Sequence, residues 1–240
     1  MINLFRKIRK NLFDNKVTSY FFYALGEIFL VMVGILLALY VNNLNEEKKQ
    51  DKQLKTILKT VRADLVTDTL VATEIIKFYD SINKYSNKII NKEYSKSNIE
   101  ECLLCRSLTT LYQPLTIQDK GYLMLKSFNQ FDMNEADSLQ LVIIQYYKSS
   151  STIIEQSNEF IKSETLKNLD YLKSKDWFVN WMQGQFTDEM REFFGESTDY
   201  RNRVASNLIL ASSNHSRFVS AHKNGAVELI NRIDTTLKSD

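Results

Sequence analysis

The sequence predicts an all-α protein in which one N-terminal transmembrane helix continues into a long helix of a soluble helical bundle. Three observations predict this fold class. An apolar stretch from Tyr20 to Val41 contains one ionisable residue of the Asp, Glu, Lys or Arg type, Glu27. Over most of the remaining chain, apolar residues recur at three- and four-residue spacing, as they do on one face of a helix. The chain has six glycines and one proline, which is too few for a turn-rich β architecture.

Length and charge divide the chain into three parts and exclude one class of partner. The parts are a basic amphipathic cytoplasmic tail (1–19), a transmembrane helix (20–41) and a periplasmic helical bundle domain (42–240). The third part is long enough for one domain with its own core. Because the formal net charge of the 240 residues is +2, with no concentrated basic face, we expect no binding to nucleic acid.

The apolar stretch is about 22 residues long, or roughly 33 Å at 1.5 Å per residue, which is enough to cross the hydrocarbon core of a bilayer. The alternatives are a secretory signal peptide and a buried helix of a soluble core. A signal peptide is disfavoured because its apolar region is only about 7–15 residues long and precedes a small-x-small cleavage site. Residues 42–46 offer no such site. We therefore expect a retained anchor in contact with membrane lipid.

In the tail before the span (residues 1–19), apolar residues recur at helical spacing, and basic residues occupy the positions between them. This pattern predicts an amphipathic segment on an anionic lipid surface, with a disordered basic tail as the alternative. Five Lys or Arg residues precede the span and five follow it within twenty positions, so the positive-inside rule gives a tie. The acidic pair Glu46 and Glu47, and the tendency of long domains to translocate regardless of charge, favour a cytoplasmic N-terminus.

Residues 42–91 contain neither glycine nor proline and carry a heptad-like seam. The seam predicts one long helix that leaves the membrane without a break. Because Asp68, Ala72 and Ser86 are poor coiled-coil residues, an intramolecular bundle is favoured over a parallel coiled coil. The seam consists of Leu54, Leu58, Val61, Leu65, Asp68, Ala72, Ile75, Tyr79, Ile82, Ser86 and Ile89.

Capping signals and helix breakers divide the rest of the chain. Ser97 with Glu100, and Asp132 with Glu135, fit capping boxes, and Pro114 interrupts the chain between them. Gly195 is expected to end a brief helix in the left-handed conformation. The expected elements are short helices at 97–111 and 117–127, a long helix from after 132 to about 173, a short helix or packed loop at 176–186, a brief helix at 187–195, and a last helix from 197 or 198 to about 237.

Glu27 is the first candidate functional residue, because a carboxylate inside hydrocarbon is costly and marks a functional hypothesis by default. Helical spacing places Tyr23, Glu27, Gly34 and Ala38 along one side, and Gly34-x-x-x-Ala38 lets backbones approach closely. This face suits oligomerisation. Three interpretations of Glu27 stay open: a proton- or cation-responsive ring in an oligomer, a neutral carboxyl that joins helices or pairs with a partner's cation, and a side chain that reaches the headgroups.

Cys102 and Cys105 form a C-x-x-C pair without the strand pattern of a thioredoxin-like site. In an oxidising periplasm this spacing predicts a local disulfide, with unpaired buried thiols as the alternative. His215 and His222 are seven residues apart on one predicted helix, about 10.5 Å, which is too far to ligate one ion. We therefore expect no metal site and interpret both histidines as residues of a polar helix face.

Chemistry-bearing motifs are otherwise lacking in the sequence. There is no Gly-rich phosphate loop, nucleophile elbow or zinc-protease motif, so we expect no enzymatic activity and no cofactor. One aromatic cluster could bind a partner or an apolar ligand, but core packing is the favoured interpretation. The cluster consists of Trp177, Phe178, Trp181 and Phe186.

Four short segments of the first 50 residues read FRKIR (5–9), YALGEI (23–28), GILLAL (34–39) and NNLNE (42–46). Together they resemble an uncharacterised single-pass membrane family of Bacteroidota, a domain of unknown function. The family often has tryptophan where this chain has Leu44, so an interfacial aromatic anchor is missing here. The resemblance implies an inner-membrane protein with a periplasmic helical domain. It implies no activity and no catalytic residue.

Two hypotheses of function follow from these patterns. The first is a non-enzymatic single-pass inner-membrane protein whose periplasmic helical domain self-associates or docks an envelope complex. The alternative is a sensor, or an ion- or proton-responsive oligomeric channel, that uses intramembrane Glu27.

Overall fold

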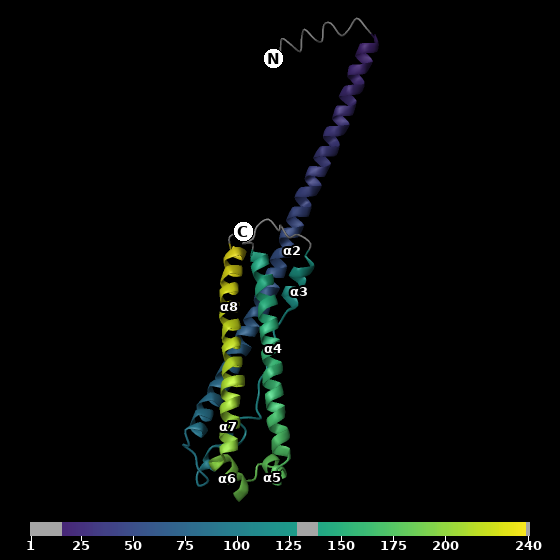
Figure 1. Ribbon diagram of the computed structural model, residues 1–240. Helices are drawn as coiled ribbons and strands as arrows, with labels where there is room; N and C mark the ends of the chain where they lie inside the picture. The colour runs from purple at the N-terminus through teal and green to yellow at the C-terminus, as the bar shows by residue number, and fades with distance from the viewer. Residues whose placement is uncertain (1–15, 129–138, 239–240) are drawn as a thin grey trace. The chain divides into compact units, whose positions relative to one another are not determined.

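The computed structural model describes residues 16–128 and 139–238, with side chains from Tyr20 onward, and over those ranges it holds helices and loops but no strand (Figure 1). The predicted all-α class is therefore confirmed. The tail up to residue 15 and the capping box of Asp132 and Glu135 lie outside the described residues. The elements are α2 (Lys16–Ile90), η1 (Ile99–Glu101), η2 (Leu103–Arg106), α3 (Lys120–Ser127), α4 (Leu139–Lys173), α5 (Phe178–Met182), α6 (Asp188–Glu196), α7 (Thr198–Ser206), η3 (Asn207–Ser212) and α8 (Ser213–Lys238).

Helix α2 contributes to two compact units, which divide between Leu54 and Lys55. It is one unbroken helix, in agreement with the absence of glycine and proline from residues 42–91. The second unit starts at Lys55. Residues 42–49, which follow the apolar stretch, are exposed and mostly polar.

The core of the second unit is built on the heptad-like seam of α2. Every seam residue from Leu58 to Ile89 is buried, including the polar Asp68 and Ser86. Helices α4 and α8 lie side by side and complete the core with residues such as Ile154 on α4 (Figure 1). The seam therefore packs within the chain, as an intramolecular helical bundle.

An extended segment, here called the strap (residues 111–119), joins η2 to α3. Side chains of α2 bind its backbone. The Tyr79 hydroxyl accepts a hydrogen bond from the Gln113 backbone N–H at 2.9 Å and donates one to the Gln113 carbonyl at 3.1 Å. The Asp68 carboxylate accepts from the Gln118 backbone N–H at 3.0 Å. These bonds satisfy backbone groups that a helix would otherwise pair, so the strap stays extended.

Helix α3 begins at Lys120, three residues later than the sequence predicts, because the strap continues through residue 119. Its first turn lies directly on α2. A Cβ atom at Gly121 would be 2.4 Å from the backbone nitrogen of Val61, so no larger residue fits there. The Gly121 N–H also donates to Asp64 Oδ2 at 2.6 Å. A glycine in this helix is thus explained by the close approach of two backbones.

Short helices and turns close one end of the bundle (Figure 1). The predicted helix at 97–111 is instead two 3₁₀ turns, η1 and η2, followed by turns. Gly195 is not a left-handed cap; it is a buried helical residue whose Cβ would meet the backbone of Ser95 and Lys96 at 2.6 Å. The predicted last helix is α7, a π-helical turn (η3) and α8, which follow one another without a loop.

Candidate functional site

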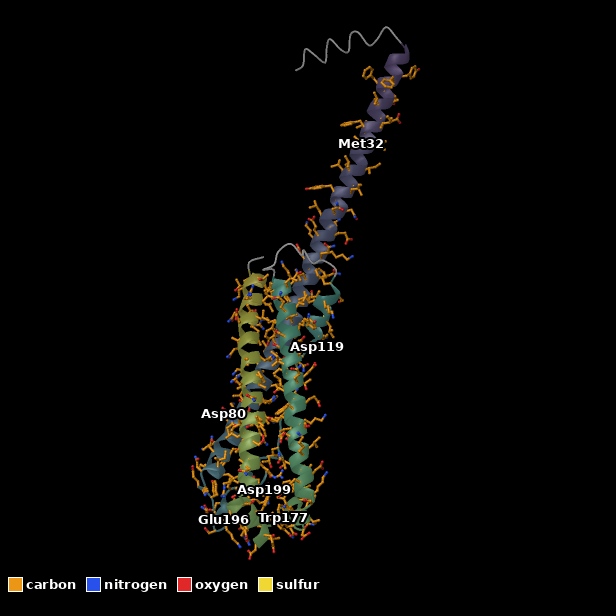
Figure 2. All side chains as sticks on the ribbon, viewed as in Figure 1. Met32, Asp80, Asp119, Trp177, Glu196 and Asp199 are labelled. Carbon is orange, nitrogen blue, oxygen red and sulfur yellow. A yellow bond between two sulfur atoms is a disulfide. The ribbon has the colours of Figure 1, made fainter. Side chains whose placement is uncertain are left out.

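The most unusual surface of the described chain is the apolar part of α2. Between Tyr20 and Val41 every residue except the half-exposed Val33 is exposed, with Leu30 at 72% and Ile28 at 64%. Figure 2 shows side chains projecting on all sides of the helix around Met32. By length and composition this is the one helix among the described residues that is a candidate membrane span. An apolar surface of this extent marks a site of contact with lipid or protein.

The predicted oligomerisation face lies on this segment. Tyr23 and Glu27 are one helical turn apart and exposed, and Gly34 and Ala38 are likewise one turn apart. A Cβ atom added at Gly34 would meet no neighbouring atom within 4 Å. Helical spacing thus brings the four residues to one side of α2, with open space over the glycine. Such a face permits close approach of a second helix.

A second candidate is a buried polar network between α2, α4 and α8. Asp68 and His222 are 1% and 3% exposed, and the Asp68 carboxylate lies 3.6 Å from His222 Nε2. The Tyr146 hydroxyl lies 2.9 Å from Nδ1 and 3.5 Å from Nε2 of the same imidazole, and it donates to the His222 carbonyl at 2.8 Å. Burial raises the pKa of the Tyr146 phenol above its usual value, so this hydroxyl stays protonated.

His215 forms a separate network on α8, about two helical turns before His222. Its Nε2 donates to the Gln113 carbonyl of the strap at 3.1 Å, since a carbonyl oxygen only accepts. Its Nδ1 therefore accepts from the Ser157 hydroxyl at 2.8 Å. Burial lowers the pKa of His215 to about 4, so the ring is neutral at pH 7.

The assignment of His215 and His222 to a polar helix face is wrong. Both side chains are buried, on the side of α8 that faces α2 and α4. A buried imidazole needs hydrogen-bond partners. Here each ring lies close to a hydroxyl group of α4, His215 to that of Ser157 and His222 to that of Tyr146. The sequence does not reveal those partners because they lie 58 and 76 residues away along the chain.

These networks contain an acid, an imidazole and hydroxyl groups, yet their geometry is that of structural cross-links. The Asp68 carboxylate is engaged by the strap backbone and His222, and both nitrogens of His215 are engaged. Within residues 16–128 and 139–238, no three His, Cys, Asp or Glu side chains converge to hold a metal ion. These polar groups therefore join helices α2, α4 and α8 to the strap.

Cys102 and Cys105 are joined by a disulfide that is 3% or less exposed. The bond lies where η1 meets η2 and belongs to the core at one end of the bundle. The Tyr200 hydroxyl donates to the Cys105 carbonyl, and the indole N–H of Trp181 donates to the Arg106 carbonyl at 3.2 Å. The cross-link thus sits inside a packed region, not on an accessible surface.

The aromatic cluster predicted between residues 177 and 186 also contributes to this end. Trp177 is 8% exposed, and Phe178, Trp181 and Phe186 pack against the same core. A hollow of about 540 Å³ lies beside Trp177 and is bordered by glutamates of α6, including Glu196. Figure 2 labels Trp177 and Glu196 at this end of the bundle. One of them, Glu192, pairs with Lys96 at 3.4 Å. Core packing therefore accounts for most of the aromatic surface.

No protein-family model, curated protein or solved structure matches the chain. The resemblance of the first 50 residues to a Bacteroidota membrane family therefore stays a prediction.

Proposed function

We propose that the chain is a non-enzymatic single-pass inner-membrane protein whose helical domain self-associates or docks an envelope complex. The observation that carries this proposal is the apolar segment of α2 between Tyr20 and Val41, which is exposed at every residue except the half-exposed Val33. Removing a large apolar side chain from water contributes roughly 1.5–3 kcal/mol. A bilayer covers all sides of such a helix at once and leaves its backbone hydrogen bonds intact.

The proposed orientation places the N-terminus in the cytoplasm and the bundle in the periplasm. The disulfide between Cys102 and Cys105 supports it, because disulfides persist in oxidising compartments. The acidic residues Glu46 and Glu47 directly after the apolar segment support it as well. A scaffold or docking role agrees with the buried polar groups, which bind one another and the strap.

Two measurements on the full chain test this proposal. After alkaline carbonate extraction we expect the protein in the membrane pellet, and release into the supernatant would contradict the anchor. A C-terminal alkaline phosphatase fusion is expected to be active, because that enzyme requires the oxidising periplasm. If the fusion is inactive while a cytoplasmic reporter at the same position works, the orientation is reversed.

A second candidate function is a proton- or cation-responsive oligomer. It is favoured by the position of Glu27, an exposed carboxyl side chain within the apolar segment and on the same side as Gly34. The test is Glu27→Gln in the full chain, with conductance of reconstituted vesicles measured across pH. Conductance or its pH dependence should change with the substitution; a variant indistinguishable from the parent removes this function.

A further inference from the structure

The hollow beside Trp177 lies at the end of the bundle that α5 and α6 close (Figure 1). Its volume of about 540 Å³ falls within the range of small-molecule sites in proteins, roughly 300–1,000 Å³. Two aromatic side chains, Trp177 and Phe193, line it together with charged and polar ones. The charged and polar residues of the lining are Lys175, Glu189, Glu192, Glu196 and Ser197. We call this cavity the end pocket.

The glutamates give the end pocket a negative charge. They stand at three- and four-residue spacing on α6, so they share one side of the helix and repel one another. Glu196 also lies in the last turn, where the helix dipole disfavours a carboxylate. Lys96 offsets part of this cost, because its ammonium pairs with Glu192 at 3.4 Å and its backbone N–H donates to Glu196 at 3.0 Å. Since Lys175 is the one cation among the lining residues, the pocket stays negative.

The aromatic part of the lining already attracts a cation. The Lys175 ammonium lies 4.3 Å from the centroid of the Tyr171 ring and 5.4 Å from that of Phe193. Both distances are within the roughly 6 Å reach of a cation–π interaction. The Phe193 and Trp177 rings are in contact, with centroids 5.4 Å apart, so they form one aromatic surface. A cation that enters the pocket meets this surface on one side and carboxylates on the other.

Trp177 contributes a hydrogen-bond donor to the end pocket. The residue is 8% exposed, and within the described residues its indole N–H makes no hydrogen bond, whereas the N–H of Trp181 donates to the Arg106 carbonyl at 3.2 Å. The Trp177 N–H is also not one of the fully enclosed polar atoms of the described chain, so it opens to the pocket that its side chain borders. Because a buried indole N–H usually finds an acceptor, a ligand with an oxygen near its cationic group fits this site.

We propose that the end pocket binds a small organic cation of the amino-alcohol type, of which choline is the simplest quaternary example. The glutamates attract the charge, the rings of Trp177 and Phe193 contact the alkylated ammonium, and the Trp177 N–H donates to the hydroxyl oxygen. A quaternary ammonium is favoured because it spreads its charge over several methyl groups, which contact more than one ring at once. This inference goes beyond the proposed function and does not depend on the membrane anchor.

Fluorine NMR of the detergent-solubilised full chain tests the pocket. The chain has two tryptophans, so incorporation of fluorotryptophan gives two resonances, and Trp177→Phe assigns them. We expect choline to shift the Trp177 resonance with a dissociation constant in the millimolar range, while the Trp181 resonance stays in place. The matched control ligand is the uncharged analogue of choline in which carbon replaces nitrogen. This analogue, and sodium chloride at the same concentration, should leave the Trp177 resonance unchanged.

A pair of glutamine variants tests the charge. Glu192→Gln keeps the size of the side chain and removes one carboxylate of the pocket, so it should weaken choline binding about fivefold. Glu228→Gln, at an exposed position of α8 outside the pocket, should not change it. Circular dichroism checks that both variants fold. If Glu192→Gln unfolds because Lys96 loses its partner, Glu189→Gln carries the same test at an exposed position of the lining.

Three outcomes would overturn the cation site. The first is a Trp177 resonance that does not respond to choline, or that responds equally to the uncharged analogue. The second is choline binding that the pocket glutamine variant leaves unchanged. The third is tighter binding of acetyl-arginine methylamide than of choline, because that result assigns the end pocket to a side chain of a partner protein instead of a small ligand.

Discussion

At the scale of single residues, His215 makes the bundle sensitive to acid. In the folded chain burial lowers the pKa of His215 from 6.5 to about 4. Because the folded-state pKa is the lower one, protonation favours the unfolded chain. The stabilising effect is complete above pH 6.5 and is lost as the pH falls from 6.5 toward 4. The full loss is on the order of 3 kcal/mol, at about 1.4 kcal/mol per pKa unit.

Thermal unfolding of the detergent-solubilised chain between pH 7.5 and 4, followed by circular dichroism, measures this dependence. The unfolding temperature should fall below pH 6.5. In a His215→Gln variant, whose amide does not titrate, the fall should be smaller, although the variant is less stable at pH 7. An unchanged slope in His215→Gln would assign the acid sensitivity to other groups.

Gly121 provides a second prediction at this scale. A methyl group there would lie 2.4 Å from Val61 N and 2.6 Å from Val61 Cα, so α3 must shift away from α2. We expect Gly121→Ala to destabilise the bundle by about 1–3 kcal/mol, the usual cost of overpacking. Gly34→Ala is the matched control, since its added methyl group meets nothing within 4 Å. Equal denaturation midpoints for the two variants would contradict the close approach.

At the scale of elements, the sequence predicts long helices well and short connections poorly. The seam of α2 is recognised because its helical period is a local property, and the structure buries it from Leu58 to Ile89. The strap is not recognisable, because the groups that hold it extended, such as Tyr79 and Asp68, are 34 and 50 residues away. The π-helical turn is missed for the same reason: Asn207 and Ser212 are fixed by bonds to distant residues.

The candidate sites also divide into those set by local spacing in the sequence and those set by contacts between distant segments. Tyr23, Glu27, Gly34 and Ala38 share a helix side by spacing alone, so the sequence places them correctly relative to one another. The apolar groove lined by Ile153 and Phe160 of α4 and by Leu210 and Phe218 of η3 and α8 joins segments about 50 residues apart in the chain, so the sequence does not predict it.

At the scale of the whole molecule, the two compact units differ in the surface that they bury. Every buried residue of the described chain lies at Ile57 or beyond, whereas the residues from Tyr20 to Val41 contribute exposed apolar surface. The core, both histidine networks and the disulfide therefore belong to residues 55–240.

The fragment 55–240 is accordingly expected to fold without the anchor. Its unfolding temperature should lie within a few degrees of that of the full chain, because every buried residue of the described ranges belongs to the fragment. A fragment without a cooperative transition would show that residues 1–54 stabilise the bundle.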